Sequence, residues 1–232
     1  MKPLGRKNYG SIGHLPTSRL GPGDHRITDG QCRIATEKCR DRHDVVIVQE
    51  KLDGSNVGVA KLDDGSIVAL GRSGYLAQTS PYEQHQLFAD WVRQNVDRFD
   101  FLTPGERLCG EWLAQAHGTV YTLAHEPFVA FDLMIGETRA NFATFSQRVA
   151  AAGFTMPHLV SVGPPRKIQD VMDALGQHGF HGADDDVEGA VWRIERQGVV
   201  DFLCKYVRPD KVDGKYLTEI SGQPPVWNWR PK

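Results

Sequence analysis

The sequence predicts an α+β fold in which mostly antiparallel sheets are flanked by helices. Short runs of β-branched and apolar residues recur along the chain, turn residues separate some neighbouring runs, and amphipathic helical patterns lie between others. The 232 residues, of which 40% are hydrophobic, are enough for one large domain or two small ones. Because no convincing linker or internal repeat interrupts the pattern, we expect one domain.

The first part of the predicted fold is an irregular arm over residues 1–43. This segment is rich in Gly, Pro, Arg and His and has no sustained hydrophobic periodicity. The domain proper is expected over residues 44–208. Residues 209–232, which carry Pro and Trp, then form a tail that either wraps around the domain or extends from it.

The domain begins with strands. Residues 45–48 are apolar on both faces, which indicates a strand buried within a sheet. Residues 56–61 and 66–70 are the next two strand candidates, and Asp64-Gly65 between them is a strong turn signal. These two strands are therefore predicted to form an antiparallel hairpin.

A helix is predicted next. Ser80-Pro81-Tyr82-Glu83 combines an N-cap serine, a proline at the first helical position and a glutamate at N3, which together indicate a capping box. The helix that follows has one apolar face, which we expect to pack in the core and which consists of Phe88, Trp91, Val92, Val96 and Phe99.

The rest of the domain combines strands with short helices. Strands are expected over residues 107–113 and 128–134, and Thr144-Phe145-Ser146-Gln147 predicts a second capped helix that Gly153 ends. A third helix is expected over residues 167–175. The domain closes with a strand pair over residues 187–194 and 199–207.

The charge of the chain excludes one broad mode of nucleic-acid binding. The net charge is −2 and the pI about 6.5, so there is no overall basic field, and any nucleic-acid site must be a local patch. Basic residues of the arm could form such a patch with the end of the tail, and a solvated charged face is an equally open alternative. The residues concerned are Arg6, Lys7, Arg19, Arg26, Arg33, Lys38, Arg40, Arg42, Trp227, Trp229, Arg230 and Lys232.

The cysteines and the apolar runs indicate a soluble, reduced protein. The four cysteines are scattered, no secretory leader is visible and no apolar run approaches a membrane span, so we expect a cytoplasmic protein without a membrane partner. Cys32, Cys39 and His43, with His25, do not have the spacing of a zinc site, and buried thiols and surface histidines are preferred. His178 and His181 are assigned to a solvated polar loop.

The stretch Lys51-Leu52-Asp53-Gly54 follows the first predicted strand. A lysine, with a pKa of ~10.4, is a poor nucleophile at neutral pH until desolvation or nearby positive charge lowers its pKa. The strand setting supplies desolvation, Gly54 lets the backbone approach a bulky ligand, and Asp53 can orient the amine or a metal ion. A surface hairpin with a salt-bridged lysine is the alternative for these four residues alone.

Five further short motifs follow in order along the chain. They are Gly71-Arg72-Ser73-Gly74, Cys109-Gly110-Glu111-Trp112, Phe128-Val129-Ala130-Phe131-Asp132, Val187-Glu188-Gly189-Ala190-Val191 and Leu203-Cys204-Lys205-Tyr206. With Lys51, this ordered set resembles the covalent nucleotidyltransferase superfamily of ATP-dependent ligases and mRNA capping enzymes, and most closely its RNA ligase family. The resemblance covers roughly residues 45–207 and implies an ATP-grasp-like adenylation domain.

The resemblance implies catalytic or metal-binding roles for four residues, and Asp53 is a fifth catalytic candidate from its own position after Lys51. Lys51 would attack the α-phosphorus of ATP, forming lysyl-AMP and pyrophosphate. Arg72 would meet the ribose, the phosphate and the incoming 5′-phosphate, and Lys205 would contact the α-phosphate. Glu188 would bind a divalent metal ion, Mg²⁺ or Mn²⁺, and Asp53 is a second candidate ligand.

The resemblance also implies a nucleoside site. Glu50 would lie at the adenine edge, largely through its backbone, Glu111 would hold a ribose hydroxyl, and Phe131 would stack on adenine with Asp132 beside it. Taken alone, Phe131 would be assigned to the core, whereas Glu111 interrupts a strand where a buried, unpaired carboxylate is unfavourable.

The chemistry of adenylyl transfer agrees with this set. Negative charge builds on phosphate oxygens, so the site needs preorganised cations, here Arg72, Lys205 and the metal ion. The same positive charges are expected to lower the pKa of Lys51 and keep its amine neutral.

The chain departs from the family pattern at two points. A second lysine often lies two positions after the one at Lys205, but Val207 occupies that position here, with Arg208 and Lys211 as candidate substitutes. The segment after Lys205 is too short for the OB domain that DNA ligases and capping enzymes add there. We therefore expect no C-terminal OB domain.

These observations predict an ATP-dependent RNA ligase that joins 5′-phosphate and 3′-hydroxyl RNA ends, with RNA repair as its natural use. The alternatives are a minimal DNA ligase, a general end-adenylating enzyme and a catalytically silent end-binding module. The expected cofactors are ATP and Mg²⁺ or Mn²⁺. The expected partner is RNA, and a separate end-processing or nucleic-acid-binding protein is a further candidate.

Overall fold

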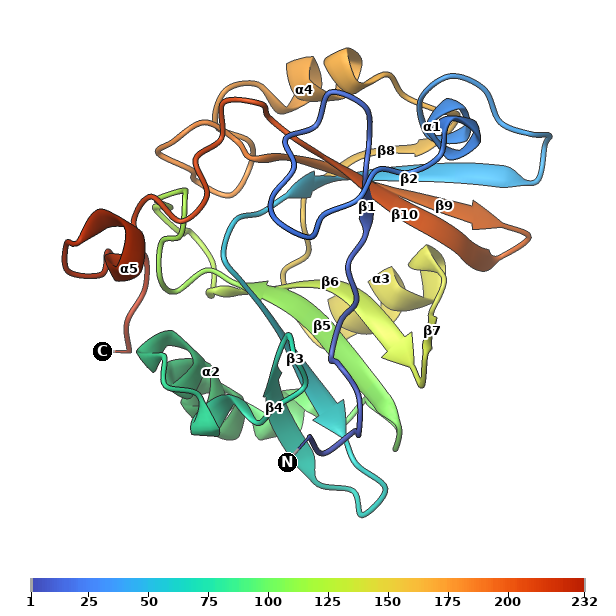
Figure 1. Cartoon of the computed structure of the whole chain (residues 1–232). Coiled ribbons are helices and arrows are strands. Elements are labelled where there is room, and N and C mark those ends of the chain that lie inside the picture. The colour runs from blue at the N-terminus through green and yellow to red at the C-terminus, as the bar shows by residue number, and fades with distance from the viewer. Residues whose placement is uncertain (1, 232) are drawn as a thin grey trace.

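Two five-stranded sheets form the framework of the protein, and Figure 1 shows them one above the other. The computed structural model describes residues 2–231 and confirms the predicted α+β class. The upper sheet has the order β1 (Gly13–His14), β10 (Val199–Val207), β9 (Gly189–Arg196), β2 (Asp44–Lys51) and β8 (Leu159–Gly163), and the lower sheet has the order β4 (Ile67–Gly71), β3 (Ser55–Lys61), β5 (Glu106–Trp112), β6 (Phe128–Ile135) and β7 (Thr138–Arg139).

The strands pair almost entirely antiparallel, as predicted; within the two sheets β1–β10 is the one parallel pair. β3 and β4 form the expected hairpin around Asp64-Gly65, where Gly65 has the positive φ of 84° that the turn requires. β9 and β10 form the expected closing pair. β8 was not predicted, because it is a short edge strand that lacks a clear alternation of buried and exposed residues.

Helices cover the outer faces of both sheets. α1 (Asp29–Thr36) and α4 (Ile168–Leu175) pack on the upper sheet, and α2 (Glu83–Gln94) and α3 (Phe142–Ala151) pack on the lower sheet. The core between α2 and the lower sheet includes Phe88, Trp91 and Val92 of that helix, as the helical pattern predicted. Val96 and Phe99 lie in a separate short helix, η2 (Val96–Phe99), in which Phe99 is buried and Val96 is exposed.

The inner faces of the two sheets carry the polar residues. Successive side chains of a strand point to opposite faces, so in β2 Val46 and Val48 reach the outer core while Gln49 and Lys51 point inward. The same alternation directs Lys205 of β10 to the inner face. The region between the sheets is therefore where the strands bring polar groups together.

Both predicted capping boxes are wrong, although both helices exist. α2 begins at Glu83 with Tyr82 as a cap that makes no side-chain hydrogen bond, because the Ser80 hydroxyl is bonded to His85 instead. α3 begins earlier than expected, because Asn141 accepts the hydrogen bond of the Thr144 amide and is the N-cap. Gly153 follows the end of α3 with a φ of 72°, as predicted.

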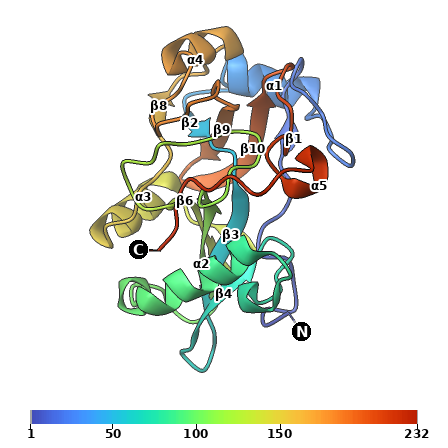
Figure 2. The ribbon, with the colours of Figure 1, turned by 90° about the vertical axis from the view of Figure 1, so that its left-hand side faces the viewer.

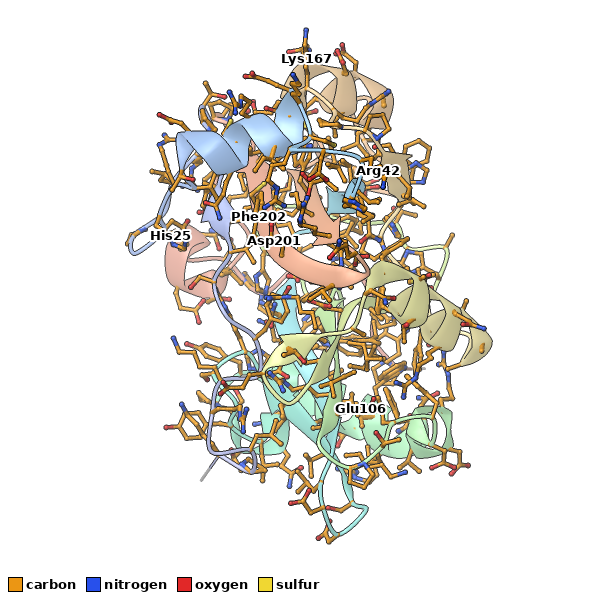
Figure 3. All side chains as sticks on the ribbon, turned by 90° about the vertical axis from the view of Figure 1, so that its right-hand side faces the viewer. His25, Arg42, Glu106, Lys167, Asp201 and Phe202 are labelled. Carbon is orange, nitrogen blue, oxygen red and sulfur yellow. The ribbon has the colours of Figure 1, made fainter. Side chains whose placement is uncertain are left out.

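The arm is more regular than predicted. It contains β1 and α1, and α1 has a capping box between Thr28 and Gln31. The helix is only 8 residues long and weakly apolar, which is why no periodicity was visible. Arg40, after α1, pairs with Asp201 of β10, a residue labelled in Figure 3, at 2.6 Å.

The tail wraps around the domain, which is one of the two arrangements left open by the sequence. In Figure 2 the red chain crosses the molecule at the level between the two sheets. It carries the short helix α5 (Thr218–Ser221), and the indole of Trp229 meets that of Trp112 edge-on at 5.7 Å between ring centroids. The division of the chain at residues 43 and 208 stays a prediction.

Two expected absences concern the metal ligands and the membrane. Within residues 2–231, Cys32, Cys39 and His43 do not form part of any cluster of three or more metal-ligating side chains. Over the same range, none of the helices has the length and hydropathy needed to cross a bilayer.

The assignment of His181 to a solvated polar loop is wrong, because the His181 side chain is buried.

Candidate active site

A cavity of about 1030 Å³ lies between the two sheets, where β2 ends and the chain crosses to β3. Lys51 is the last residue of β2, and residues 52–54 make the crossing. Seven of the eight predicted site residues line the cavity, namely Glu50, Lys51, Asp53, Arg72, Glu111, Phe131 and Lys205. The eighth, Glu188, lies behind Lys51 and contacts it directly.

Lys51 forms an ion pair with Glu188, whose Oε2 lies 2.6 Å from the lysine Nζ. Lys51 pairs in the sheet with Gly189, so the register of β2 against β9 places this glutamate beside the amine. Burial by itself lowers the pKa of Lys51, but the negative charges of Glu188 and Glu111 outweigh it and raise that pKa above its ordinary value. The expectation of a neutral amine is therefore wrong for the protein without ligand.

Two further carboxyl groups in the cavity have strongly raised pKa values. Burial raises the pKa of Glu111 to about 7, against the opposing charge of Lys51, and its Oε1 accepts the Gly54 amide at 3.1 Å. Burial likewise raises the pKa of Glu50 to about 7, and the Phe180 amide donates to its Oε2 at 3.0 Å. Perturbed acids gathered in one cavity are typical of functional sites.

Gly54 is needed for a reason that differs from the expected one. A Cβ atom at this position would lie 2.5 Å from the backbone oxygen of Trp112 in β5. The close approach that requires glycine is thus made by the neighbouring strand rather than by a ligand. It keeps the crossing segment tight against the lower sheet, next to Glu111.

Asp53 is bonded to the tail and to the segment after β5. Its Oδ2 lies 2.8 Å from Nζ of the buried Lys211 and accepts the amide of Gly118 at 2.9 Å and the hydroxyl of Thr119 at 3.2 Å. Lys211, a candidate phosphate contact from the sequence, is used here to hold Asp53. The other candidate, Arg208, pairs with Asp186 at 2.8 Å.

Lys205 is the second lysine of the site and lies beside the arm. Burial and the charge of Lys51 lower its pKa. Asp24 of the arm lies 3.8 Å from its Nζ, and the His14 Nε2 lies 3.0 Å from the same carboxylate. The parallel pairing of His14 with Lys205 in β1 and β10 makes this contact possible. The sequence carried no signal for Asp24, because the arm showed no pattern.

The arm also shapes the two remaining site residues. Arg72 lies in the turn after β4, where its backbone oxygen accepts the Asn8 amide at 3.1 Å, and its side chain is exposed without a salt bridge in the described chain. Phe131 is half-buried, and Tyr9 meets its ring edge-on at 5.1 Å between centroids. The Tyr9 hydroxyl donates to Asp132 at 3.0 Å.

Three histidines, His125, His158 and His181, form a chain of hydrogen bonds that reaches the backbone of Glu50. The sequence analysis did not predict this chain. The backbone amide of His158 donates to His181 Nε2 at 3.1 Å, so His181 Nδ1 carries the proton and donates to His125 Nε2 at 2.9 Å. His158 also accepts the Glu50 amide through its backbone oxygen at 2.9 Å. The chain therefore fixes the end of β2 next to Lys51.

The comparisons with known proteins agree with this geometry. A family model described as RNA ligase matches residues 44–207, which is most of the chain. The chain belongs to the RNA ligase family. A search of curated proteins found no match.

Solved structures of RNA ligases share the fold. An archaeal ATP-dependent RNA ligase is 20% identical, with 86% of this chain and 48% of that chain covered and a TM-score of 0.50. Naegleria gruberi RNA ligase with PPi is 16% identical, with 93% and 62% covered and a TM-score of 0.56. A mutant of the same ligase with ATP and Mn is 16% identical, with 87% and 60% covered and a TM-score of 0.54.

At identities of 16–20%, the likeness to these RNA ligases shows a shared fold. The chain spans between about half and three-fifths of the length of these structures. It covers the region in which the cavity lies, because the family match begins at β2 and ends with β10.

Proposed function

We propose that this protein is an ATP-dependent RNA ligase that joins 5′-phosphate and 3′-hydroxyl ends through a covalent AMP on Lys51. Family membership supports ligase chemistry. The observation that carries the proposal is the position of the Lys51 amine, which lies inside a cavity with Lys205 and Arg72 on its walls. Repair of broken RNA is the use that we propose.

In the first step, self-adenylation, Lys51 acts as the nucleophile. The ammonium first loses a proton to solvent; the nitrogen then attacks the α-phosphorus of ATP, a P–N bond forms, the bond to the pyrophosphate oxygen breaks and pyrophosphate leaves, and a second proton passes from the nitrogen to solvent. Lys205 and Arg72 supply the positive charge that the phosphate oxygens need. Phe131 offers a ring, held edge-on by Tyr9, on which the adenine stacks.

The residues of the cavity fit a divalent metal ion in part. Glu188 has one oxygen bonded to Lys51 and lies beside a cavity that also holds Glu111. Within residues 2–231 no group of three or more His, Cys, Asp or Glu side chains is arranged to hold a metal ion, so the proposed ion would take most of its ligands from phosphates and water, as Mg²⁺ does. Such an ion would neutralise the charge of Glu188 and so lower the pKa of Lys51.

The two later steps use the same groups. The 5′-phosphate of an RNA attacks the phosphorus of the Lys51-bound AMP, the P–N bond breaks and the lysine regains its proton. The 3′-hydroxyl then attacks the activated 5′-phosphate and AMP leaves. Arg72, exposed and without a salt bridge in the described chain, is the side chain that we assign to the incoming phosphate.

Incubation with α-labelled ATP and Mg²⁺, followed by denaturation, tests the proposal. Label should remain on the wild-type protein, be absent from Lys51→Ala, and move to RNA and then into sealed product when 5′-phosphorylated RNA is added. Sealing of nicked DNA in preference to RNA would favour a DNA ligase. Absence of any covalent label would leave an end-binding module and contradict the proposal.

A further inference from the structure

The cavity extends beyond the residues assigned above, onto the connection between β4 and α2. This connection contains the short helix η1 (Ala77–Thr79) and leads into the first turn of α2. We call its cavity-lining part the 75–85 wall, which consists of Tyr75, Leu76, Ala77, Thr79, Ser80, Pro81, Tyr82 and His85. None of these residues belongs to the motifs that the adenylation step uses.

The hydrogen-bonding groups of the wall are neutral. His85 is bonded at both ring nitrogens, to the Ser55 hydroxyl at 2.8 Å and to the Ser80 hydroxyl at 2.8 Å. A neutral imidazole donates through one nitrogen and accepts through the other, so one of the two serines accepts from His85 and keeps its own proton for another partner. Both serines line the cavity, so one neutral hydroxyl donor, from Ser55 or from Ser80 of the wall, is offered to a ligand beside His85.

The apolar groups of the wall include two half-exposed aromatic rings. Tyr75 and Tyr82 are each 51% exposed although they line the cavity, and Leu76 and Pro81 lie between them in the sequence. Exposed aromatic rings next to neutral hydroxyl groups suit a nucleobase and its sugar, because every base has a face that stacks on an aromatic ring. They do not suit pyrophosphate, which requires cations.

Arg72 connects the wall to the nucleophile. It lies in the turn before Tyr75, lines the same cavity as Lys51, and is exposed. The Gly71 amide donates to the Tyr75 backbone oxygen at 2.9 Å, so this turn fixes the arginine and the tyrosine relative to one another. A phosphate at Arg72 would carry its nucleoside toward the wall.

The size of the cavity allows a second nucleotide. Sites for one drug-sized ligand have volumes of ~300–1,000 Å³. This cavity, at about 1030 Å³, is slightly larger than that range. Its Lys51 side and its 75–85 wall can therefore be occupied together, as transfer of AMP to an RNA end requires.

We propose that the 75–85 wall binds the terminal nucleoside of the RNA strand that carries the 5′-phosphate, with the phosphate held by Arg72 beside Lys51. This inference rests on the proposed function and adds the residues that hold the RNA end. In the transfer step the phosphate oxygen forms a bond to the phosphorus of the lysine-bound AMP, the P–N bond breaks, and a proton returns to the Lys51 amine.

The test separates adenylation from transfer. Each protein is first labelled with α-labelled ATP, and the rate of labelling is recorded. The labelled protein is freed of ATP and mixed with increasing amounts of a 5′-phosphorylated RNA oligonucleotide. Tyr82→Ala should lower the ratio of transfer to self-adenylation about tenfold, because one stacked base is lost. Tyr75→Ala should act in the same direction.

Two controls accompany these variants. Tyr82→Phe keeps the ring and should keep the wild-type ratio, because among residues 2–231 the Ser80 hydroxyl is bonded by the Tyr82 backbone amide, which the variant retains, and not by the Tyr82 hydroxyl. Val199→Ala, at a residue 67% exposed in the β9–β10 hairpin, should change neither rate.

Three results would overturn the inference. The first is an unchanged ratio in both tyrosine-to-alanine variants. The second is equal competition by an RNA with a 5′-hydroxyl end, which would assign the wall to the strand that carries the 3′-hydroxyl. The third is a wild-type protein that takes no label at all, which would contradict the proposed function and this inference with it.

Discussion

The protonation state of Lys51 depends on Glu188, whose carboxylate oxygen lies 2.6 Å from the amine. Removing the negative charge with Glu188→Gln should lower the Lys51 pKa, because burial then acts against the charged amine with less opposition. Amine-specific labelling at a series of pH values, read by mass spectrometry, measures this. The labelling midpoint of Lys51 should move to lower pH in the variant than in the wild type.

If Glu188 holds the metal ion, Glu188→Gln should also slow self-adenylation, even though the same change makes the Lys51 amine easier to deprotonate. A Lys51 midpoint that does not move, or that moves to higher pH, would show that Glu188 does not control the amine.

His181 makes folding stability depend on pH. Burial, and then the neighbouring histidines, lower the pKa of His181 to about 4, and its Nε2 is an acceptor that protonation would remove. Because the folded pKa lies below the unfolded one, this group stabilises the fold above pH ~6.5 and loses that contribution as the pH falls toward 4, on the order of 3 kcal/mol.

Urea unfolding at pH 4.5 and pH 7 tests this dependence. His181→Gln should lose less stability between the two pH values than the wild type does. Equal losses in the two proteins would mean that His181 titrates normally and that the histidine chain does not hold the end of β2.

At the residue scale, the motifs predicted which side chains meet. Seven predicted residues line one cavity, because five of them lie on strands that border it, whereas Asp53 lies in the crossing after β2 and Arg72 in the turn after β4. The charge state of Lys51 could not be predicted, because it depends on how closely Glu188 and Glu111 approach it. Tyr9, Asp24 and His181 were not found, because their roles arise from contacts between distant segments.

The segment that crosses from β2 to β3, residues 52–54, holds Lys51 in position. Gly54→Ala would place a Cβ atom 2.5 Å from the Trp112 backbone oxygen, which cannot move without breaking the pairing of β3 with β5. We expect a destabilisation of about 1–3 kcal/mol and a slower self-adenylation. Thermal unfolding and α-label incorporation measure the two effects.

Gly30→Ala is the matched control for this variant. Gly30 is exposed in α1, and its nearest neighbour is the Thr28 hydroxyl at 4.0 Å from an added Cβ. This change should be neutral or stabilise α1 by up to about 1 kcal/mol. If Gly54→Ala behaved like Gly30→Ala, the tight crossing would not be required.

At the element scale, strands were predicted better than helix starts. The β3–β4 hairpin follows from a local turn signal, whereas Ser80 was expected to cap α2 and is instead bonded to His85 in the first turn of that helix, whose other ring nitrogen is bonded to Ser55 of β3. Short elements such as α1 and β8 have little periodicity of their own and are stabilised by packing on the upper sheet. Tertiary contacts of this kind are invisible in a local pattern.

At the scale of the whole molecule, the site requires both sheets. The upper sheet supplies Lys51 and Lys205, Glu188 lies just before β9 of that sheet, and the lower sheet supplies Glu111 and Phe131. The arm, for which RNA contact and a solvated charged face were equally open, packs along both sheets, and several of its basic residues form ion pairs, among them Arg19 with Asp213. RNA binding by the arm stays a prediction.

The central claim is that Lys51, rather than the neighbouring Lys205, receives AMP. The most direct measurement is peptide mapping by mass spectrometry after incubation with ATP and Mg²⁺, under conditions that preserve the acid-sensitive P–N bond. The account predicts one AMP on the peptide that contains Lys51 and none in Lys51→Arg, which keeps the positive charge. AMP on Lys205, or no adduct on a folded wild-type protein, would contradict it.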